Sequence, residues 1–158
     1  MLSTPHLLAG TAIGLAVGNP VAGFVLAVAS HFLLDAIPHT DPGTWHYGED
    51  MKKFRLHGGD YATGIIDSIV AVGAFLALSH TSPLMAAAPI AGAIGGVLPD
   101  SLVYLGIMFR GIHEWPGIKQ YNALIHPIHY TARPNQWVLG VVTQLAVIAI
   151  SVGVILHY

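Results

Sequence analysis

Long apolar segments that carry almost no charge constrain the fold of this chain more than any other feature. A helix needs about 20 apolar residues to cross roughly 30 Å of hydrocarbon, and the 158-residue chain contains several such runs. Its composition agrees with a lipid environment, because 54% of the residues are hydrophobic and only 9% are charged, whereas an ordinary soluble domain is about 25% charged. We therefore predict an all-α fold, a polytopic transmembrane helical bundle of about five helices.

Prolines that follow small polar residues mark the starts of three predicted helices. The pairs Thr4-Pro5, Asn19-Pro20 and Ser82-Pro83 each precede an apolar run. The other two runs follow Gly58-Gly59 and Pro134-Asn135. The sequence thus predicts a single transmembrane domain over 1–158, with helices at about 5–18, 20–37, 60–80, 83–109 and 136–157 and cytoplasmic loops at 38–59 and 110–135.

The basic side chains give the predicted bundle an orientation. The chain has six Lys and Arg residues, and all of them lie in the loops 38–59 and 110–135. Five crossings place these loops on one side of the membrane, which the positive-inside rule makes the cytoplasmic side. We expect a protein of the prokaryotic cytoplasmic membrane with its N-terminus inside and its C-terminus outside. No basic residue precedes the first apolar stretch, so a cleaved signal peptide is not expected.

The expected partner of the predicted helices is the lipid bilayer. A formal net charge of −2 gives no reason to expect binding to nucleic acid. A homo-oligomer is left open.

Glycines recur at four-residue spacing in two predicted helices: Gly10, Gly14 and Gly18 in one, and Gly92 and Gly96 in another. Small residues let helix backbones approach closely in lipid. We interpret them as positions of close helix packing.

Three aspartates, Asp35, Asp67 and Asp100, lie inside apolar segments. An ionised aspartate near the centre of a transmembrane helix costs roughly 2.5 to 3.5 kcal/mol. This cost calls for a partner, and all Lys and Arg residues of the chain lie in the predicted loops. Metal cations or protons are therefore the expected compensating charges.

Histidines accompany these aspartates in the cytoplasmic half of the predicted bundle. His31 and Asp35 are four residues apart and so share a helix face. Imidazole together with carboxylate suits Zn, Mn or Fe, and the available donors could hold one or two divalent ions. The predicted metal ligands are His6, His31, Asp35, His39, Asp67 and Asp100.

Two further residues, Asp60 and His126, are candidates for moving a proton during catalysis. Each has a simpler interpretation. Asp60 could cap its helix, because Gly-Gly-Asp before an apolar run is a good N-cap signal. His126 and His129 could be loop residues with no special role, and Asp41 could be an interfacial residue bound to water. The aspartates inside the helices could likewise form a purely structural hydrogen-bond network.

Three segments resemble a known family. They are Thr4-Pro5-His6-Leu7-Leu8-Ala9-Gly10, Ser30-His31-Phe32-Leu33-Leu34-Asp35 and Gly95-Gly96-Val97-Leu98-Pro99-Asp100. Together they look like the predicted membrane-bound metal-dependent hydrolases, including the LexA-regulated inner-membrane group. The chain resembles a distant or rearranged relative, because its Pro-Asp segment follows the Ser-His segment instead of preceding it and the usual His-Arg-Gly-x-x-His signature is absent. The resemblance implies that His6, His31, Asp35 and Asp100 belong to a metal site.

These observations leave three functions open. The first is a membrane-embedded metal-dependent hydrolase that acts on a phosphoester or lipid-like substrate at the cytoplasmic membrane boundary. The second is a cation or proton transporter, although the outer halves of the predicted helices offer no evident polar exit. The third is a non-catalytic membrane protein with a structural Asp/His or metal cluster.

Overall fold

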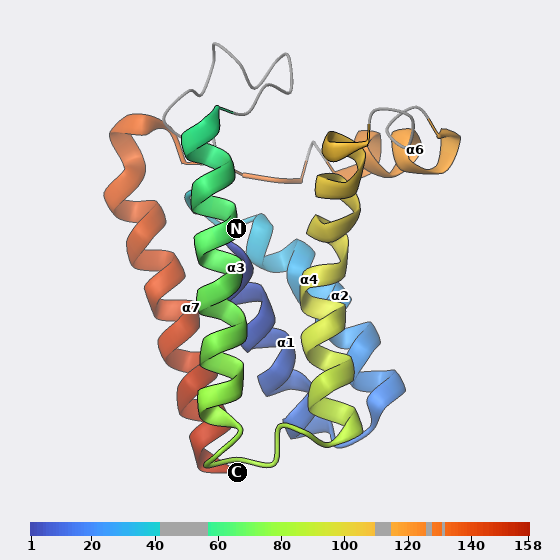
Figure 1. Cartoon of the computed structure of the whole chain (residues 1–158), viewed down its shortest axis with the longest axis vertical. Coiled ribbons are helices and arrows are strands. Elements are labelled where there is room, and N and C mark those ends of the chain that lie inside the picture. The colour runs from blue at the N-terminus through green and yellow to red at the C-terminus, as the bar shows by residue number, and fades with distance from the viewer. Residues whose placement is uncertain (42–56, 110–114, 126–127, 131) are drawn as a thin grey trace.

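The computed structural model describes residues 1–41, 57–109, 115–125, 128–130 and 132–158. These residues form six α-helices and one 3-10 helix, with no β-strand among them (Figure 1), so the predicted all-α helical bundle is confirmed. The elements are α1 (Ser3–Val17), α2 (Pro20–Asp35), α3 (Gly58–Leu78), α4 (Ala87–Met108), α6 (Pro116–Ile125), η3 (Pro134–Gln136) and α7 (Trp137–His157).

Three segments of the described chain are long and apolar enough to cross a membrane: Gly58–Leu78, Ala87–Leu105 and Pro134–His157. The helices α1 and α2 are shorter, with 15 and 16 residues. At 1.5 Å per residue they extend about 22 and 24 Å, which is less than the roughly 30 Å of a hydrocarbon core. The lengths support membrane association through three helices, and crossing by α1 and α2 stays a prediction.

The outer surface of the bundle is apolar. In α3 the buried residues are only Asp60 and Ala71, while Ile65, Ile66 and Ile69 are each more than half exposed. Water-soluble monomers rarely expose contiguous apolar surface of this kind. This surface therefore suits the acyl chains of a bilayer.

The short helix α1 lies inside the bundle, where it packs against α2, α3, α4 and α7 (Figure 1). Glycines make this packing close. A Cβ atom added at Gly10 would collide with the carbonyl oxygen of Gly92, and one added at Gly96 would collide with that of His6. The predicted close packing is confirmed at Gly10, Gly14, Gly92 and Gly96, and it brings the first turn of α1 against the middle of α4. The prediction is wrong at Gly18, which has open space around it and ends α1 in the left-handed conformation, with φ 70°.

Helix starts agree with the sequence at some positions and differ at others. Asn19 caps α2 by accepting hydrogen bonds of 3.0 Å from the backbone of Val21 and of Ala22, and Pro20 is the first helical residue. The pair Ser82-Pro83, in contrast, does not open a helix, since α4 begins at Ala87. The intervening segment instead buries Leu84 completely in the core.

The 110–135 segment was predicted as a loop, but it contains the helix α6. Pro116 at its first position is the signal that was missed. This helix lies across the end of α4 (Figure 1) and contacts it. Most of the predicted loop 38–59, namely residues 42–56, lies outside the described residues.

The start of α1 is recessed within the bundle. Its residues Ser3 and Thr4 hydrogen-bond to Asp67 of α3, which lies nine residues after Gly58, the first residue of that helix. Nine helical residues correspond to roughly 14 Å. Figure 1 accordingly places the N-terminus beside the body of α3, below the end of the bundle from which α3 starts.

Candidate metal centre

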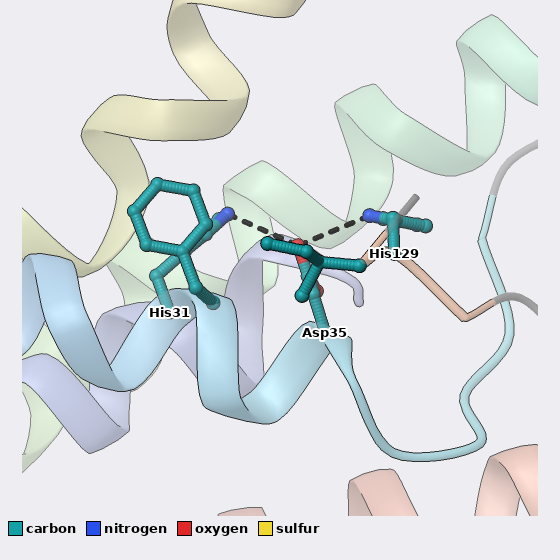
Figure 2. A pocket seen from close by; sticks show the side chains of 5 residues that line it. His31, Asp35 and His129 are labelled. Atoms are coloured by element: carbon teal, nitrogen blue, oxygen red, sulfur yellow. Dashed lines mark ion pairs between the residues drawn. The ribbon is translucent and has the colours of Figure 1, made fainter. Parts of the chain in front are cut away.

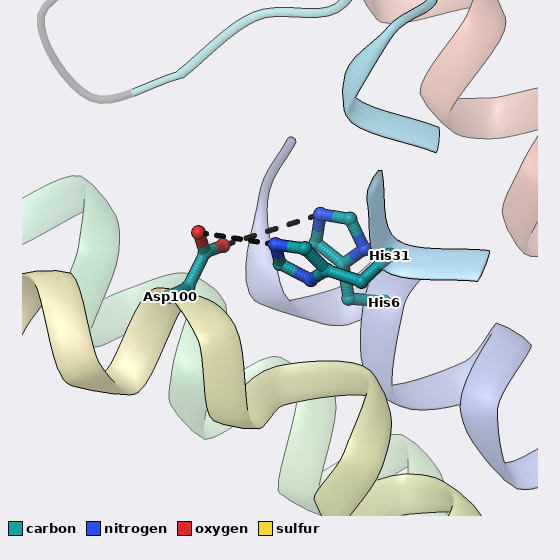
Figure 3. Close-up of side chains that lie close together, drawn as sticks. All are labelled: His6, His31 and Asp100. Atoms are coloured by element: carbon teal, nitrogen blue, oxygen red, sulfur yellow. Dashed lines mark ion pairs between the residues drawn. The ribbon is translucent and has the colours of Figure 1, made fainter. Parts of the chain in front are cut away.

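Three helices bring two histidines and an aspartate together inside the bundle. His6 comes from the first turn of α1, His31 from the end of α2 and Asp100 from α4 (Figure 3). The two imidazole rings stack with their centroids 3.9 Å apart. Asp100 lies 3.5 Å from His31 Nε2 and 4.0 Å from His6 Nε2. Because both rings are buried, these side chains form a polar cluster within an apolar bundle.

A second group forms just beyond the end of α2. His39 Nε2 lies 2.9 Å from Asp41 Oδ2 and 3.2 Å from His129 Nε2, and His129 Nε2 lies 2.7 Å from the same oxygen of Asp41. Two backbone hydrogen bonds hold the two segments side by side, from Tyr130 N to Asp35 O and from Ala132 N to His39 O, both 2.7 Å long. This pairing brings His129 to the cluster from 90 residues along the chain.

Asp35 lies between the two groups (Figure 2). Its Oδ1 is 3.0 Å from His6 Nε2, and its Oδ2 is 3.1 Å from His31 Nε2 and 3.2 Å from His129 Nδ1. As the last residue of α2, Asp35 reaches toward the bundle interior on one side and toward the 128–132 segment on the other. The carboxylate therefore joins the two groups into one cluster.

The hydrogen bonds of His31 and His39 decide which ring nitrogen faces the cluster. His31 Nδ1 donates to the Gly96 carbonyl at 2.8 Å, and His39 Nδ1 donates to the Ile37 carbonyl at 2.8 Å. In a neutral imidazole the other nitrogen, Nε2, then carries a lone pair. In both residues this lone pair faces carboxylate oxygens, so a cation must lie between them, either a second proton or a metal ion.

Asp41 and the Met1 amino group lie close together and shift each other's pKa values. Burial raises the pKa of Asp41, but the N-terminal amino group and the imidazoles of His129 and His39 lower it further, so that it lies well below its usual range. Burial lowers the pKa of the Met1 amino group, and the carboxylates of Asp41, Asp100 and Asp35 raise it to about 10. That amino group lies 2.5 Å from Asp35 Oδ1 and 3.1 Å from Asp41 Oδ1. The space between these two carboxylates thus already accommodates a positive charge.

Helix α7 supports the segment that carries His39. Gln144, which is buried, donates to the Thr40 hydroxyl at 2.5 Å and accepts from the backbone of Leu2 at 2.9 Å. A Cβ atom added at Gly140 would lie 2.9 Å from the carbonyl carbon of His39. Gln144 and Gly140 of this apolar helix therefore fix the position of the second group, which contains His39, relative to the start of α1.

Four of the six predicted metal ligands, His6, His31, Asp35 and Asp100, meet directly, and His39 reaches the same cluster through Asp35 at 3.9 Å. Asp67 has other contacts. Its carboxylate accepts hydrogen bonds from Ser3 and Thr4, and neither described group of potential metal ligands includes it.

The structure bears on only one of the two residues predicted to move a proton, Asp60. Asp60 accepts a hydrogen bond of 2.8 Å from the backbone of His57. It therefore contributes to capping α3, as its alternative role predicted, but as the third helical residue of a capping box whose N-cap is His57. His126 lies outside the described residues. Both stay predictions as catalytic groups.

Asp41 and His129 are the cluster residues that the sequence analysis left out of its ligand set. The first signal that could have found them is the His39-Thr40-Asp41 spacing directly after an apolar helix, since two residues of extended chain return the side chain to the same face. The second is the His-Pro-Ile-His run at 126–129. Their assignment required the backbone pairing of Tyr130 with Asp35 and of Ala132 with His39, which no local pattern encodes.

The donor set fits a divalent metal. Potential ligand atoms lie within 4.8 Å of one another in His6, His31 and Asp100, and likewise in Asp35, His39 and His129. Imidazole nitrogens and carboxylate oxygens are the ligands of Zn, Mn and Fe sites. His6 offers Nε2 to Asp35 and Asp100, while its Nδ1 is buried and has no hydrogen-bond partner among the described residues.

A small pocket opens onto the cluster. Its empty volume of about 190 Å³ includes the solvent at its mouth, and it is lined by His31, Phe32, Asp35, Ile128 and His129 (Figure 2). Polar cluster atoms thus share this pocket with two apolar side chains.

Comparison of the chain with protein-family models, with curated proteins and with solved structures finds no match.

Proposed function

We propose that this chain is a membrane-embedded metal-dependent hydrolase that acts on a phosphoester of a lipid-like substrate. The observation that carries the proposal is the convergence on Asp35 of imidazole nitrogens from three separate parts of the chain, His6, His31 and His129. Charged and polar groups in a membrane bundle are costly and usually functional. We further propose that the chain is a distant relative of the predicted membrane-bound metal-dependent hydrolases, on the strength of its three sequence segments.

The residues that would hold a metal are His6, His31, Asp35 and Asp100, together with His39, Asp41 and His129. A bound divalent ion lowers the pKa of a water ligand toward 7 and neutralises charge that develops on a phosphoryl oxygen. The hydrogen bonds from His31 and His39 to backbone carbonyls orient both rings so that Nε2 faces the cluster. These contacts would preorganise the ligands before an ion or substrate arrives.

A hydroxyl from α6 is available to bind substrate. The Tyr121 hydroxyl is buried and has no hydrogen-bond partner among the described residues. Burial, and then the carboxylates of Asp100 and Asp35, raise the pKa of Tyr121 to about 12, so the phenol keeps its proton at neutral pH. We propose that it donates a hydrogen bond to an oxygen of the substrate. His126 remains the candidate for proton transfer.

The surroundings of the cluster support a substrate with an apolar part. Phe32 and Ile128 line the same pocket as Asp35, and Ile128 is 52% exposed. On the outer face of α2 near this pocket, Leu33 is 72% exposed. A headgroup at the metal ligands and an acyl chain against these residues would suit both environments, whereas a fully hydrophilic ester would not use the apolar wall.

The decisive experiment measures metal content and turnover on the same protein samples. Detergent-purified protein would be loaded with Zn, Mn or Fe, analysed by elemental mass spectrometry and assayed with phosphatidic acid and with bis(p-nitrophenyl) phosphate. We expect bound metal and turnover in the wild type and the loss of both in His31→Gln. Ser101→Ala, an exposed neighbour of Asp100 on α4, is the matched control. Wild-type protein that binds none of these ions would reject the proposal.

A structural cluster is the second candidate, because protons could satisfy the same side chains. Each oxygen of the Asp35 carboxylate already faces an imidazole nitrogen. If this candidate holds, His31→Gln lowers the unfolding temperature, while the wild type turns over neither substrate at any metal concentration.

We also propose a cytoplasmic-membrane location with the N-terminus inside and the C-terminus outside. The chain has no cysteine, so single cysteines can report the topology. In intact cells, a membrane-impermeant maleimide should label Thr81→Cys, between α3 and α4, and should spare Lys119→Cys in α6. Both positions are exposed. The reverse labelling pattern would invert the proposed orientation.

A further inference from the structure

Six of the seven side chains of the cluster form two sets of the same composition. The inner set consists of His6, His31 and Asp100, supplied by α1, α2 and α4. The outer set consists of His39, His129 and Asp41, supplied by the segment after α2 and by the 128–132 segment. Each set offers two imidazoles and one carboxylate, which is three of the four ligands of a tetrahedral site.

Asp35 supplies the missing ligand to both sets. Its Oδ2 is 3.1 Å from His31 of the inner set and 3.2 Å from His129 of the outer set. Its Oδ1 is 3.0 Å from His6 and 3.9 Å from His39. We propose that the protein binds two divalent metal ions in adjacent positions and that the Asp35 carboxylate bridges them. This inference rests on the proposed function and specifies the metal stoichiometry of its site.

The histidine orientations support two positions instead of one. Each set contains one ring whose Nδ1–H is fixed by a backbone carbonyl, His31 by Gly96 and His39 by Ile37. In each set the freed Nε2 points at a different terminal carboxylate, Asp100 at 3.5 Å and Asp41 at 2.9 Å. One ion could not serve both pairs, because its ligands must all lie within about 2.0 to 2.3 Å of it.

The charge of the cluster agrees with two ions. With neutral imidazoles, the carboxylates of Asp35, Asp41 and Asp100 carry a formal charge of −3, and the Met1 amino group that lies against two of them brings the total to −2. One divalent ion would leave no net charge to attract a phosphate group, whereas two would give +2, which attracts it. Pairs of metal ions also stabilise both the attacking and the leaving oxygen in phosphoester chemistry. A bridged pair is therefore the arrangement best suited to the proposed substrate.

Manganese tests the inference directly, because coupled and isolated Mn²⁺ ions differ in their electron paramagnetic resonance spectra. Purified protein freed of metal would be titrated with Mn²⁺, and bound ions would be counted by elemental mass spectrometry. We expect two ions per wild-type chain with an exchange-coupled spectrum. Asp100→Asn and Asp41→Asn should each retain one ion with an uncoupled spectrum, and Asp35→Ala should lose the coupling.

Asp67→Asn is the matched control, because Asp67 is an aspartate within an apolar helix but belongs to neither set. It should keep two coupled ions. A wild type that saturates at one uncoupled ion would overturn the bridged pair and leave a mononuclear hydrolase intact. A wild type that binds no ion would overturn both proposals. Because the wild-type count and spectrum decide the matter alone, a variant that fails to fold does not weaken the test.

Discussion

The hydroxyl of Thr4 in α1 donates a hydrogen bond of 2.6 Å to the carboxylate of Asp67 in α3. The same carboxylate accepts from the backbone nitrogens of Ser3 at 2.5 Å and Thr4 at 3.2 Å. The first N–H groups of a helix have no acceptor within the helix itself. An aspartate inside one apolar helix thus caps another, and these hydrogen bonds stabilise its charge.

Replacement of Asp67 should destabilise the bundle and spare the metal centre. Loss of a capping side chain costs about 0.5 to 2 kcal/mol, so Asp67→Ala should lower the unfolding temperature in detergent by several degrees. Asp67→Asn keeps one acceptor oxygen and should have a smaller effect. The metal content of both folded variants should equal that of the wild type. Loss of metal from folded Asp67→Asn would restore this residue to the ligand set.

The helices were predictable from sequence because their determinants are local. Apolar runs, the Asn19 cap and Pro20 define α2, and glycine spacing indicated which positions of α1 pack closely against another helix, which the structure shows to be α4. Ser82-Pro83 misled because it carries the same local signal as Asn19-Pro20, whereas the burial of Leu84 in the core determines where α4 begins. That burial is a tertiary effect that no dipeptide encodes.

Part of the candidate metal centre was predictable, because the positions of His31, Asp35 and Asp100 depend on helix geometry. The position of His129 depends on pairing between distant segments and was not predictable. His31 and Asp35 share one helix face, and helix direction placed Asp100 at the same end of the bundle. His129 reaches Asp35 only because backbone hydrogen bonds join segments distant in sequence. Asp67 shows the converse, since a carboxylate within an apolar helix looks the same in sequence whether it binds a metal or caps another helix.

Close packing of α1 against α4 should be necessary for the metal centre. In Gly92→Ala the new methyl group would collide with the backbone carbonyl of Gly10, so the two helices must separate and His6 must move away from Asp100. We expect destabilisation of about 1 to 3 kcal/mol and weaker metal binding. Gly73→Ala is the control, because nothing lies within 4 Å of the position where its methyl group would be. Equal unfolding temperatures for the two variants would contradict this packing.

Metal binding should release protons. Burial lowers the pKa of His129, but hydrogen bonds to Asp35 and Asp41 raise it more strongly, to about 9. The ion-free protein therefore holds a proton on this imidazole at pH 7, and a metal ion must displace it. Metal affinity should rise with pH up to about 9 and then level off, since the competing proton is then lost.

Calorimetry in two buffers of different ionisation enthalpy, both at pH 7, measures the number of protons released per metal ion. His129→Gln should release about one proton fewer than the wild type, because its amide does not titrate. Identical binding enthalpies in the two buffers would mean that no proton leaves and would contradict the prediction.

The apolar wall of the pocket should select the substrate. Ile128 lines the pocket beside Asp35 and His129 and is exposed, so its replacement removes apolar contact area without opening a hole in the core. Ile128→Asp should reduce turnover of phosphatidic acid at least tenfold, because a carboxylate in place of the apolar side chain disfavours an acyl chain and repels a phosphate.

Ile128→Asn separates these two effects, since it is polar but uncharged. If acyl-chain contact matters, Ile128→Asn should lose phosphatidic acid turnover and largely keep turnover of bis(p-nitrophenyl) phosphate. Equal losses on both substrates would mean that this wall does not contact the acyl chain.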